Sequence, residues 1–255
     1  MRLLFILIPF FLLTACGGDV KTMSKADSAN LLMTEAGKLV RQGMEERKNQ
    51  KEDSLSDDSR SVLLFGDARD LYLKALQLDP QNFKTYSYIG TTYYFSGKFR
   101  ESVPYYKKAL QLNPGYKEAW FNLGMVYDQL KLQDSAINAF SECIRADSSY
   151  VPAYAQLSRL TMLKELKADH AMEILQLAAK HKPDSDVPWN EMSAIYFRMQ
   201  DTANAISALE TAAKLRPENT TRLYNLSLYF RQHNDSTKYN YYLHRLEEMK
   251  RKGMK

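Results

Sequence analysis

Prolines recur in this chain at a nearly constant spacing, and this regularity constrains the fold more than any other feature of the sequence. Pro80, Pro114, Pro183 and Pro217 each close a segment, and they are separated by 34, then 69, then 34 residues. The middle interval equals two periods of 34 residues with one residue added. Such a period is typical of architectures in which each unit cannot bury its hydrophobic face alone and stacks on its neighbours. We therefore expect an array of similar structural units.

Within each period, two short patterns repeat. The first is a quartet at spacings of three, one and three residues, which places its members on one face of a helix. The second alternates small and large residues, so that neighbouring helices approach closely beside the small ones. The quartets are Tyr86/Ile89/Gly90/Tyr93, Trp120/Leu123/Gly124/Tyr127, Tyr154/Leu157/Ser158/Thr161, Trp189/Met192/Ser193/Tyr196 and Leu223/Leu226/Ser227/Phe230, and the second patterns are Ser102/Tyr106/Ala109, Ala136/Phe140/Cys143, Ala171/Leu175/Ala178 and Ala205/Leu209/Ala212.

These patterns and the closing prolines resemble the tetratricopeptide repeat, over residues 83–219 and more weakly on both sides. The resemblance implies an all-α fold, an α-solenoid of antiparallel helix hairpins with about five to six repeats. Ser158, Ser193 and Ser227 replace the glycine of the family pattern. Because serine is also small, close helix approach remains possible at these positions.

The period also predicts the organisation of the chain. We expect a degenerate first unit at residues 28–82, in which a first helix at 28–47 precedes a polar insert at 48–61 that lacks apolar periodicity and forms a mobile loop. Asp134, Asp201 and Asp235 precede second helices and are predicted N-caps. Four full units are expected at 83–116, 117–150, 151–185 and 186–219, followed by a capping repeat with a basic tail at 220–255.

The N-terminus carries a targeting pattern. Residues 3–13 form an apolar run of eleven residues, which is short of the about 20 that span a bilayer. The following Leu13-Thr14-Ala15-Cys16 resembles the lipobox of bacterial lipoprotein precursors. That resemblance implies a signal peptide at 1–15, a lipid on Cys16 and a lipidated tether at 16–27. Because the residue immediately after Cys16 is not Asp, the resemblance also favours the outer membrane, facing the periplasm. The alternative is an ordinary secretory signal with a chance cysteine.

Other classes of function lack a supporting pattern. The formal net charge is +5, and acidic and basic residues interleave instead of forming a basic stripe, so no nucleic-acid partner is expected. No metal or other cofactor is expected either, because no two histidines have ligand spacing. Cys143 occupies a small-residue position of a second helix and is predicted to be a buried, inert thiol. Because the sequence shows no recognisable catalytic motif, we predict that the chain is not an enzyme.

In the tetratricopeptide fold, the face of each first helix opposite its quartet lines the inner surface of the superhelix. That face mixes aromatic, Met and polar residues, which suits an extended peptide or a helix. Some of these side chains could instead pack on the next repeat. The predicted groove residues are Tyr94, Phe121, Met125, Arg159, Met162, Asn190, Phe197 and Tyr224.

These features predict a membrane-anchored scaffold or adaptor that binds a protein or peptide partner, in assembly of a cell-envelope complex. The alternative is a glycan-binding or enzyme-accessory envelope lipoprotein, in which aromatic residues stack on sugars.

One class of ligand, a C-terminal carboxylate, is not expected. The clamp that some tetratricopeptide proteins use for a C-terminal carboxylate requires Lys, Asn, Asn, Lys and Arg at fixed places, and here only Asn122 matches.

Overall fold

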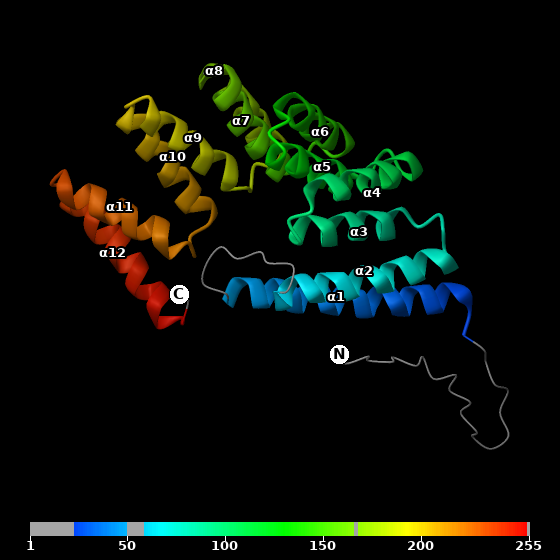
Figure 1. Cartoon of the computed structure of the whole chain (residues 1–255). Coiled ribbons are helices and arrows are strands. Elements are labelled where there is room, and N and C mark those ends of the chain that lie inside the picture. Colours follow the sequence, from blue (N-terminus) through cyan, green and yellow to red (C-terminus); the bar gives the residue numbers. More distant parts are fainter. Residues whose placement is uncertain (1–22, 50–58, 166–167, 254–255) are drawn as a thin grey trace.

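The computed structural model describes residues 23–49, 59–165 and 168–253, and all regular secondary structure in these ranges is helical (Figure 1). This confirms the predicted all-α solenoid. Its twelve described helices form six antiparallel hairpins. In chain order they are α1 (Lys25–Asn49), α2 (Arg60–Leu78), α3 (Phe83–Phe95), α4 (Phe99–Leu112), α5 (Lys117–Gln129), α6 (Gln133–Ala146), α7 (Val151–Glu165), α8 (Ala168–His181), α9 (Val187–Arg198), α10 (Thr202–Leu215), α11 (Thr220–Gln232) and α12 (Ser236–Arg251).

The hairpins stack side by side into an arc (Figure 1). Each second helix packs on the first helix of the next hairpin, as α2 does on α3 and α4 on α5. First helices of neighbouring hairpins also touch, as α3 touches α5 and α7 touches α9. The second helices α4 and α6 are separated by a cleft. Because elements on the inside of a curved stack lie closer together than those on the outside, the first helices line the inner surface.

In two of the predicted repeats, the small quartet residue is a glycine that packs against an aromatic ring of the second helix. A Cβ atom at Gly90 would lie 2.9 Å from Cζ of Tyr106, and one at Gly124 would lie 2.7 Å from Cε1 of Phe140. Both rings are fully buried. The bare glycine backbone therefore makes room for the ring of the second helix, which is the physical reason for the small residue in each quartet.

The turns inside four of the hairpins, α3–α4, α5–α6, α9–α10 and α11–α12, share one backbone geometry. The last turn of the first helix is closed by a hydrogen bond that spans five residues, such as the one from the N–H of Leu132 to the carbonyl of Tyr127 at 2.8 Å. This bond, with a left-handed residue just before the donor, is the Schellman motif. The motif holds the two helices antiparallel across a short connection. The left-handed residues are Gly97, Lys131, Gln200 and Asn234, with φ angles of 74°, 61°, 61° and 58°.

Two of the three predicted N-caps are confirmed, and one is wrong. The side chains of Asp201 and Asp235 accept hydrogen bonds from the backbone N–H groups of the residues three positions later. Helix α6 instead begins at Gln133, so that Leu132 is its N-cap and Asp134 lies in the first turn. There an acidic side chain stabilises the helix through the positive end of its dipole.

The expected limits of the first hairpin need correction. Helix α1 starts at Lys25, inside the expected tether, and both ends of the expected 48–61 loop are helical, because α1 continues to Asn49 and α2 starts at Arg60. Packing accounts for the extra turns: a Cβ at Gly43 would lie 2.7 Å from the ring of Phe65, which is fully buried and stacks on Phe95. This contact joins helices across the insert, so a local pattern did not reveal it. The predicted signal peptide, Cys16 and residues 50–58 lie outside the described residues.

Candidate functional site

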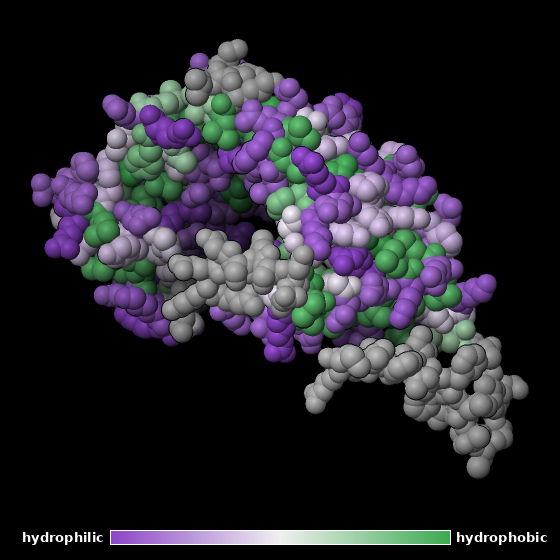
Figure 2. Space-filling view, in the orientation of Figure 1, coloured by the Kyte–Doolittle hydropathy of each residue, from purple (hydrophilic) through white to green (hydrophobic). Residues whose placement is uncertain are grey.

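The inner surface of the arc is the candidate binding surface. Figure 2 shows a hollow at the middle of the arc, whose visible wall carries hydrophilic side chains together with hydrophobic ones. The eight predicted groove residues all lie on first helices, at the C-terminal end of α3 and along α5, α7, α9 and α11. They differ in how much of each side chain is exposed. Some pack within the wall of the solenoid, one forms an ion pair, and the others are free.

Tyr94 and Phe121 take part in the packing of their own hairpins. The ring of Tyr94 lies 5.5 Å from that of Phe95 and 5.4 Å from that of Phe99, and burial raises the pKa of its hydroxyl. The ring of Phe121 lies 5.6 Å from that of Phe140 and 5.4 Å from that of Tyr150. Aromatic pairs at these separations stabilise the fold beyond the area they bury. These two side chains therefore support the solenoid wall with part of their surface.

Met125 and Met162 are also half-buried. Met125 packs against the cluster around Phe140 and Leu160, and Met162 packs against the cluster around Leu175 and Met192. Both clusters join residues of neighbouring hairpins. The two methionines therefore fill the seams between repeats, and only their remaining surface faces the hollow.

Arg159 links neighbouring first helices by charge. Its Nη2 lies 2.6 Å from Oδ2 of Asp128 on α5, and its Nε donates to Oε1 of Gln156 at 3.1 Å. On the other side, burial raises the pKa of the Glu191 carboxyl on α9, and the positive charge of Arg159 opposes that increase. The guanidinium group of Arg159 thus already makes most of its contacts within this protein.

Asn190, Phe197 and Tyr224 form the free group. Phe197 is 43% exposed and Tyr224 is 54% exposed, while Asn190 is exposed and its side chain has no hydrogen-bond partner in the part of the chain that the structure describes. Val187, on the same side of α9, is also partly exposed. We call Val187, Asn190, Phe197 and Tyr224 the exposed strip. Exposed aromatic side chains and a free amide are the kinds of group that anchor peptides at binding surfaces.

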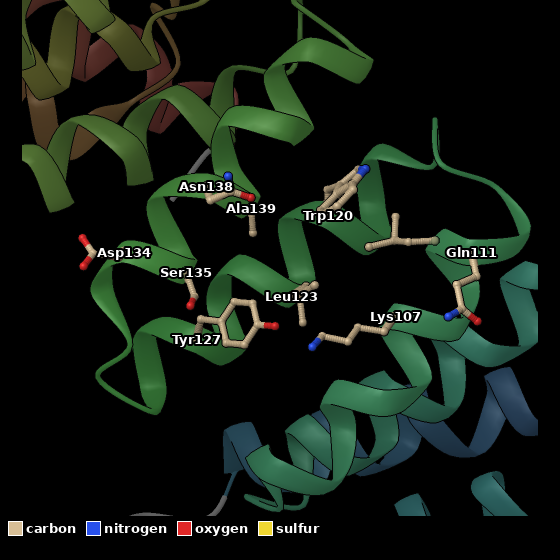
Figure 3. Close-up of a pocket in the computed structure, with 10 residues that line it drawn as sticks. Lys107, Gln111, Trp120, Leu123, Tyr127, Asp134, Ser135, Asn138 and Ala139 are labelled. Carbon is tan, nitrogen blue, oxygen red and sulfur yellow. The ribbon is translucent and has the colours of Figure 1, made fainter.

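The outer surface carries clefts of a different origin. One of them, about 600 Å³ in volume, lies between α4 and α6 above α5. Figure 3 shows Trp120, Leu123 and Tyr127 of α5 along its floor, with polar side chains of α4 and α6 at its rim. Two smaller clefts, of about 440 and 390 Å³, occupy the equivalent positions above α9 and α11. Because the same places in the repeat line all three, the stacking of hairpins itself produces them.

The described residues contain neither a metal-type cluster nor a spanning helix. No three His, Cys, Asp or Glu side chains in residues 23–49, 59–165 and 168–253 are grouped as metal ligands. Over the same ranges no helix combines the length and apolarity needed to cross a bilayer. Cys143 is fully buried, and burial raises the pKa of its thiol to about 12, so it is protonated at neutral pH and a poor nucleophile.

Comparison with known families decides what kind of repeat this is. Two family models, each described as Tetratricopeptide repeat, match residues 89–151 and 188–219. The chain contains tetratricopeptide repeats. The first match runs from α3 to the start of α7, and the second covers α9 and α10. Of the free residues, Asn190 and Phe197 belong to the second matched repeat, and Tyr224 lies in the hairpin that follows it.

Curated relatives share these repeats over part of their length. BBSome complex member BBS4 of Bos taurus is 27% identical over 164 residues, which cover 64% of this chain and 31% of that protein. Protein O-mannosyl-transferase Tmtc3 of Drosophila melanogaster is 23% identical over 150 residues, which cover 59% of this chain and 16% of that protein. The chain thus spans about a third of the first relative and less of the second, and the likeness is confined to the repeats.

Solved structures show the same fold. The structure titled functional characterization of Pseudomonas aeruginosa pilF has a TM-score of 0.61 at 14% identity, covering 88% of this chain and 93% of that one. YrrB, whose title describes a TPR protein with an unusual peptide-binding site, has a TM-score of 0.50 at 17% identity, covering 78% and 98%. At these identities the likeness concerns the arrangement of the helices alone.

The repeat pattern did not single out a buried ion pair beside the exposed strip. Arg222 of α11 is only 6% exposed, and its Nη2 lies 2.6 Å from Oδ2 of Asp186, the N-cap of α9. Its Nη1 donates to the carbonyl of Ala212 on α10 at 2.8 Å. The pair fixes α11 to the preceding hairpin and thereby sets where Tyr224 lies relative to Phe197. The partners are 36 residues apart, so no local spacing indicates the contact.

Proposed function

We propose that this chain is a lipid-anchored scaffold of the bacterial cell envelope that holds a protein or peptide partner against the inner surface of its solenoid. The observation that carries this proposal is the exposed strip, where Phe197 and Tyr224 keep large exposed aromatic side chains while the packing faces of α9 and α11 are already filled. A repeat scaffold with large unused aromatic side chains on its concave side is suited to binding a partner, not to catalysis.

The anchoring part of the proposal rests on the sequence around Cys16. A lipid there would place the solenoid close to the membrane, because α1 begins at Lys25, nine residues after Cys16. Nine extended residues reach about 30 Å at most. The two or three acyl chains of a bacterial lipoprotein hold a protein on a bilayer, at about 0.8 kcal/mol for each buried CH₂ group.

Replacing Cys16 by serine is expected to release the protein from membranes, because the acyl chains have no other site of attachment in the proposal. The measurement is cell fractionation followed by immunoblotting of the soluble and membrane fractions, with a high-salt wash to remove proteins held by charge. Cys143→Ala is the matched control and should remain with the membranes. Sedimentation of the Cys16→Ser protein with salt-washed membranes would contradict the lipid anchor.

A Phe197→Ala/Tyr224→Ala variant is expected to lose its partner and keep its fold. Both rings are exposed, so their truncation changes stability little, whereas the loss of central aromatic anchors typically costs about 2–4 kcal/mol of affinity. The measurement is co-purification from detergent-solubilised membranes, beside a thermal melt by circular dichroism. Phe121 is unsuitable for this test, because truncating it also removes its packing on Phe140 and Tyr150.

A matched control separates the inner surface from the outer clefts. Tyr241 is 53% exposed and lies on α12, beside the outer cleft above α11. Tyr241→Ala removes an aromatic ring of similar exposure and should leave the partner bound. If the partner stays on the Phe197→Ala/Tyr224→Ala protein, the inner surface is not the binding site. Recovery of polysaccharide in place of a protein would support the glycan-binding alternative.

A further inference from the structure

Two arginines beside the exposed strip have no partner. Arg198 lies in the last turn of α9 and Arg231 in the last turn of α11. Both are exposed, and neither side chain makes a hydrogen bond or ion pair in the described part of the chain. Arg159 differs, because Asp128 already neutralises it. The C-terminal end of this surface therefore carries two cations that have no ion-pair partner among the described residues.

Helix geometry places these arginines on the same side as the exposed strip. Arg198 follows Val187 by eleven residues, close to three helical turns, and Arg231 follows Tyr224 by seven residues, close to two turns. Residues separated by whole turns lie on one face. Both arginines therefore flank the exposed apolar side chains, in positions from which their guanidinium groups can reach a ligand bound along the strip.

Among the described residues no acid forms an ion pair with either arginine. The acidic residue on the inner side of α9 is Glu191, which is half-buried. The inner side of α11 carries Thr221, Tyr224, Leu228 and Arg231, without an acid. Asn190 on α9 is exposed, and so is Asn225, which stands in α11 at the place that Glu191 has in α9. Neither side-chain amide has a hydrogen-bond partner among the described residues. The surface thus presents apolar anchors, free amides and positive charge together.

We propose that the C-terminal half of the inner surface selects an acidic linear peptide with apolar anchors. Phe197 and Tyr224 hold the apolar side chains, Asn190 and Asn225 bond to the extended backbone, and Arg198 and Arg231 pair with carboxylates. The inference rests on the proposed function and adds to it the chemical class of the partner. Guanidinium groups suit carboxylates because their paired N–H groups match the two oxygens. The same charges repel a basic peptide, which supplies selectivity as well as affinity.

Three synthetic peptides of equal length test this selectivity. Each carries a fluorescein label and the same Phe and Leu anchors, with Glu, Gln or Lys at the intervening positions. Binding is measured by fluorescence anisotropy with the purified full-length protein in detergent. We expect the Glu peptide to bind about tenfold more tightly than the Gln peptide, and the Lys peptide more weakly than both. The advantage of the Glu peptide should shrink as salt is added.

An Arg198→Gln/Arg231→Gln variant is expected to remove the preference for Glu over Gln while its affinity for the Gln peptide changes by less than about twofold. The matched control is Arg100→Gln/Lys108→Gln, which removes two exposed and unpaired cations from the second helix α4. This control changes the net charge by the same amount but leaves the inner surface of α9 and α11 unaltered. It should therefore keep the full preference for the Glu peptide. Loss of the preference in both variants would show that net charge, not this surface, is responsible.

The remaining outcomes separate the two proposals. If the Glu and Gln peptides bind equally, and Phe197→Ala/Tyr224→Ala weakens both, then the acid preference is wrong and the binding groove stands. If no peptide binds, or if binding survives the Phe197→Ala/Tyr224→Ala change, both proposals are overturned. A fall in sedimentation coefficient of the arginine variant without peptide would instead assign the surface to contact between copies of the chain, which also overturns the peptide proposal.

Discussion

Replacing Gly124 by leucine is expected to lower the stability of the array by about 3 kcal/mol, which corresponds to a fall in Tm of about 6–12 °C. The added Cβ alone would lie 2.7 Å from Cε1 and 2.8 Å from Cδ1 of Phe140. Because Phe140 is fully buried, its ring cannot move aside without disturbing the core between α5 and α6. The better helix propensity of leucine, about 1 kcal/mol, offsets only part of this cost. Thermal unfolding followed by far-ultraviolet circular dichroism measures the change.

Gly66→Leu is the matched control for this prediction. Gly66 is also helical, but a Cβ there would meet its nearest neighbour, Nη2 of Arg69, at 3.7 Å, which is an ordinary contact. Its Tm should stay unchanged or rise, because glycine is a poor helix former. Cys143→Ala removes one buried sulfur atom and should cost only about 1 kcal/mol. An unchanged Tm for Gly124→Leu would contradict the close approach of the two helices at this residue.

Replacing Arg222 by leucine is expected to destabilise the C-terminal hairpin by about 3 kcal/mol, because it leaves the carboxylate of Asp186 buried without its main partner. Asp186 is 8% exposed, and the nearest remaining cation, Nη2 of Arg216, lies 3.7 Å from its Oδ1. The carbonyl of Ala212 also loses its hydrogen bond from Nη1 of Arg222. Relative to the wild-type protein, the variant should show a larger increase in amide hydrogen exchange in α11 and α12 than in α3 and α4. Partner binding should weaken too, since Tyr224 lies on α11.

Asp186→Ala combined with Arg222→Leu tests whether the cost comes from the unpaired charge. The double variant should be more stable than Arg222→Leu alone, because no buried carboxylate remains. In the wild-type protein Nε of Arg222 is buried without a hydrogen-bond partner, so part of the pair's benefit is already offset. Lys38→Ala breaks an ion pair whose side chains are about half exposed, and it should cost less than about 1 kcal/mol. Equal losses for Arg222→Leu and Lys38→Ala would contradict a buried pair.

The local pattern of the sequence was enough to predict the helices and their packing faces. The spacing of three, one and three residues fixes which side chains share a helical face, whatever the rest of the chain does. The pairing of Gly90 with Tyr106 and of Gly124 with Phe140 repeats with the period, and both pairs are in contact in the structure. Hydrophobic periodicity and small-residue spacing are local properties, so they can be read from one sequence.

Features that depend on the connections and contacts between helices were harder to predict. The Schellman turns place Lys131, Gln200 and Asn234 in the left-handed region, where glycine is the usual signal and only Gly97 supplied it. The contact of Gly43 with Phe65 extends the first hairpin beyond the limits that the repeat period gave. Polar composition alone therefore overestimated the loop, because burial of one ring draws the flanking residues into helices.

The sequence by itself determined that this chain is a helical solenoid and which side of each first helix packs against its neighbours. Only the tertiary structure decided which inward side chains are free. Phe121 and Tyr224 occupy the same place in their repeats, yet Phe121 packs on Tyr150 whereas Tyr224 remains 54% exposed. The difference arises because each side chain's exposure depends on residues of the neighbouring hairpin about 30 positions away, and a repeat pattern fixes the direction of a side chain but not what lies opposite it.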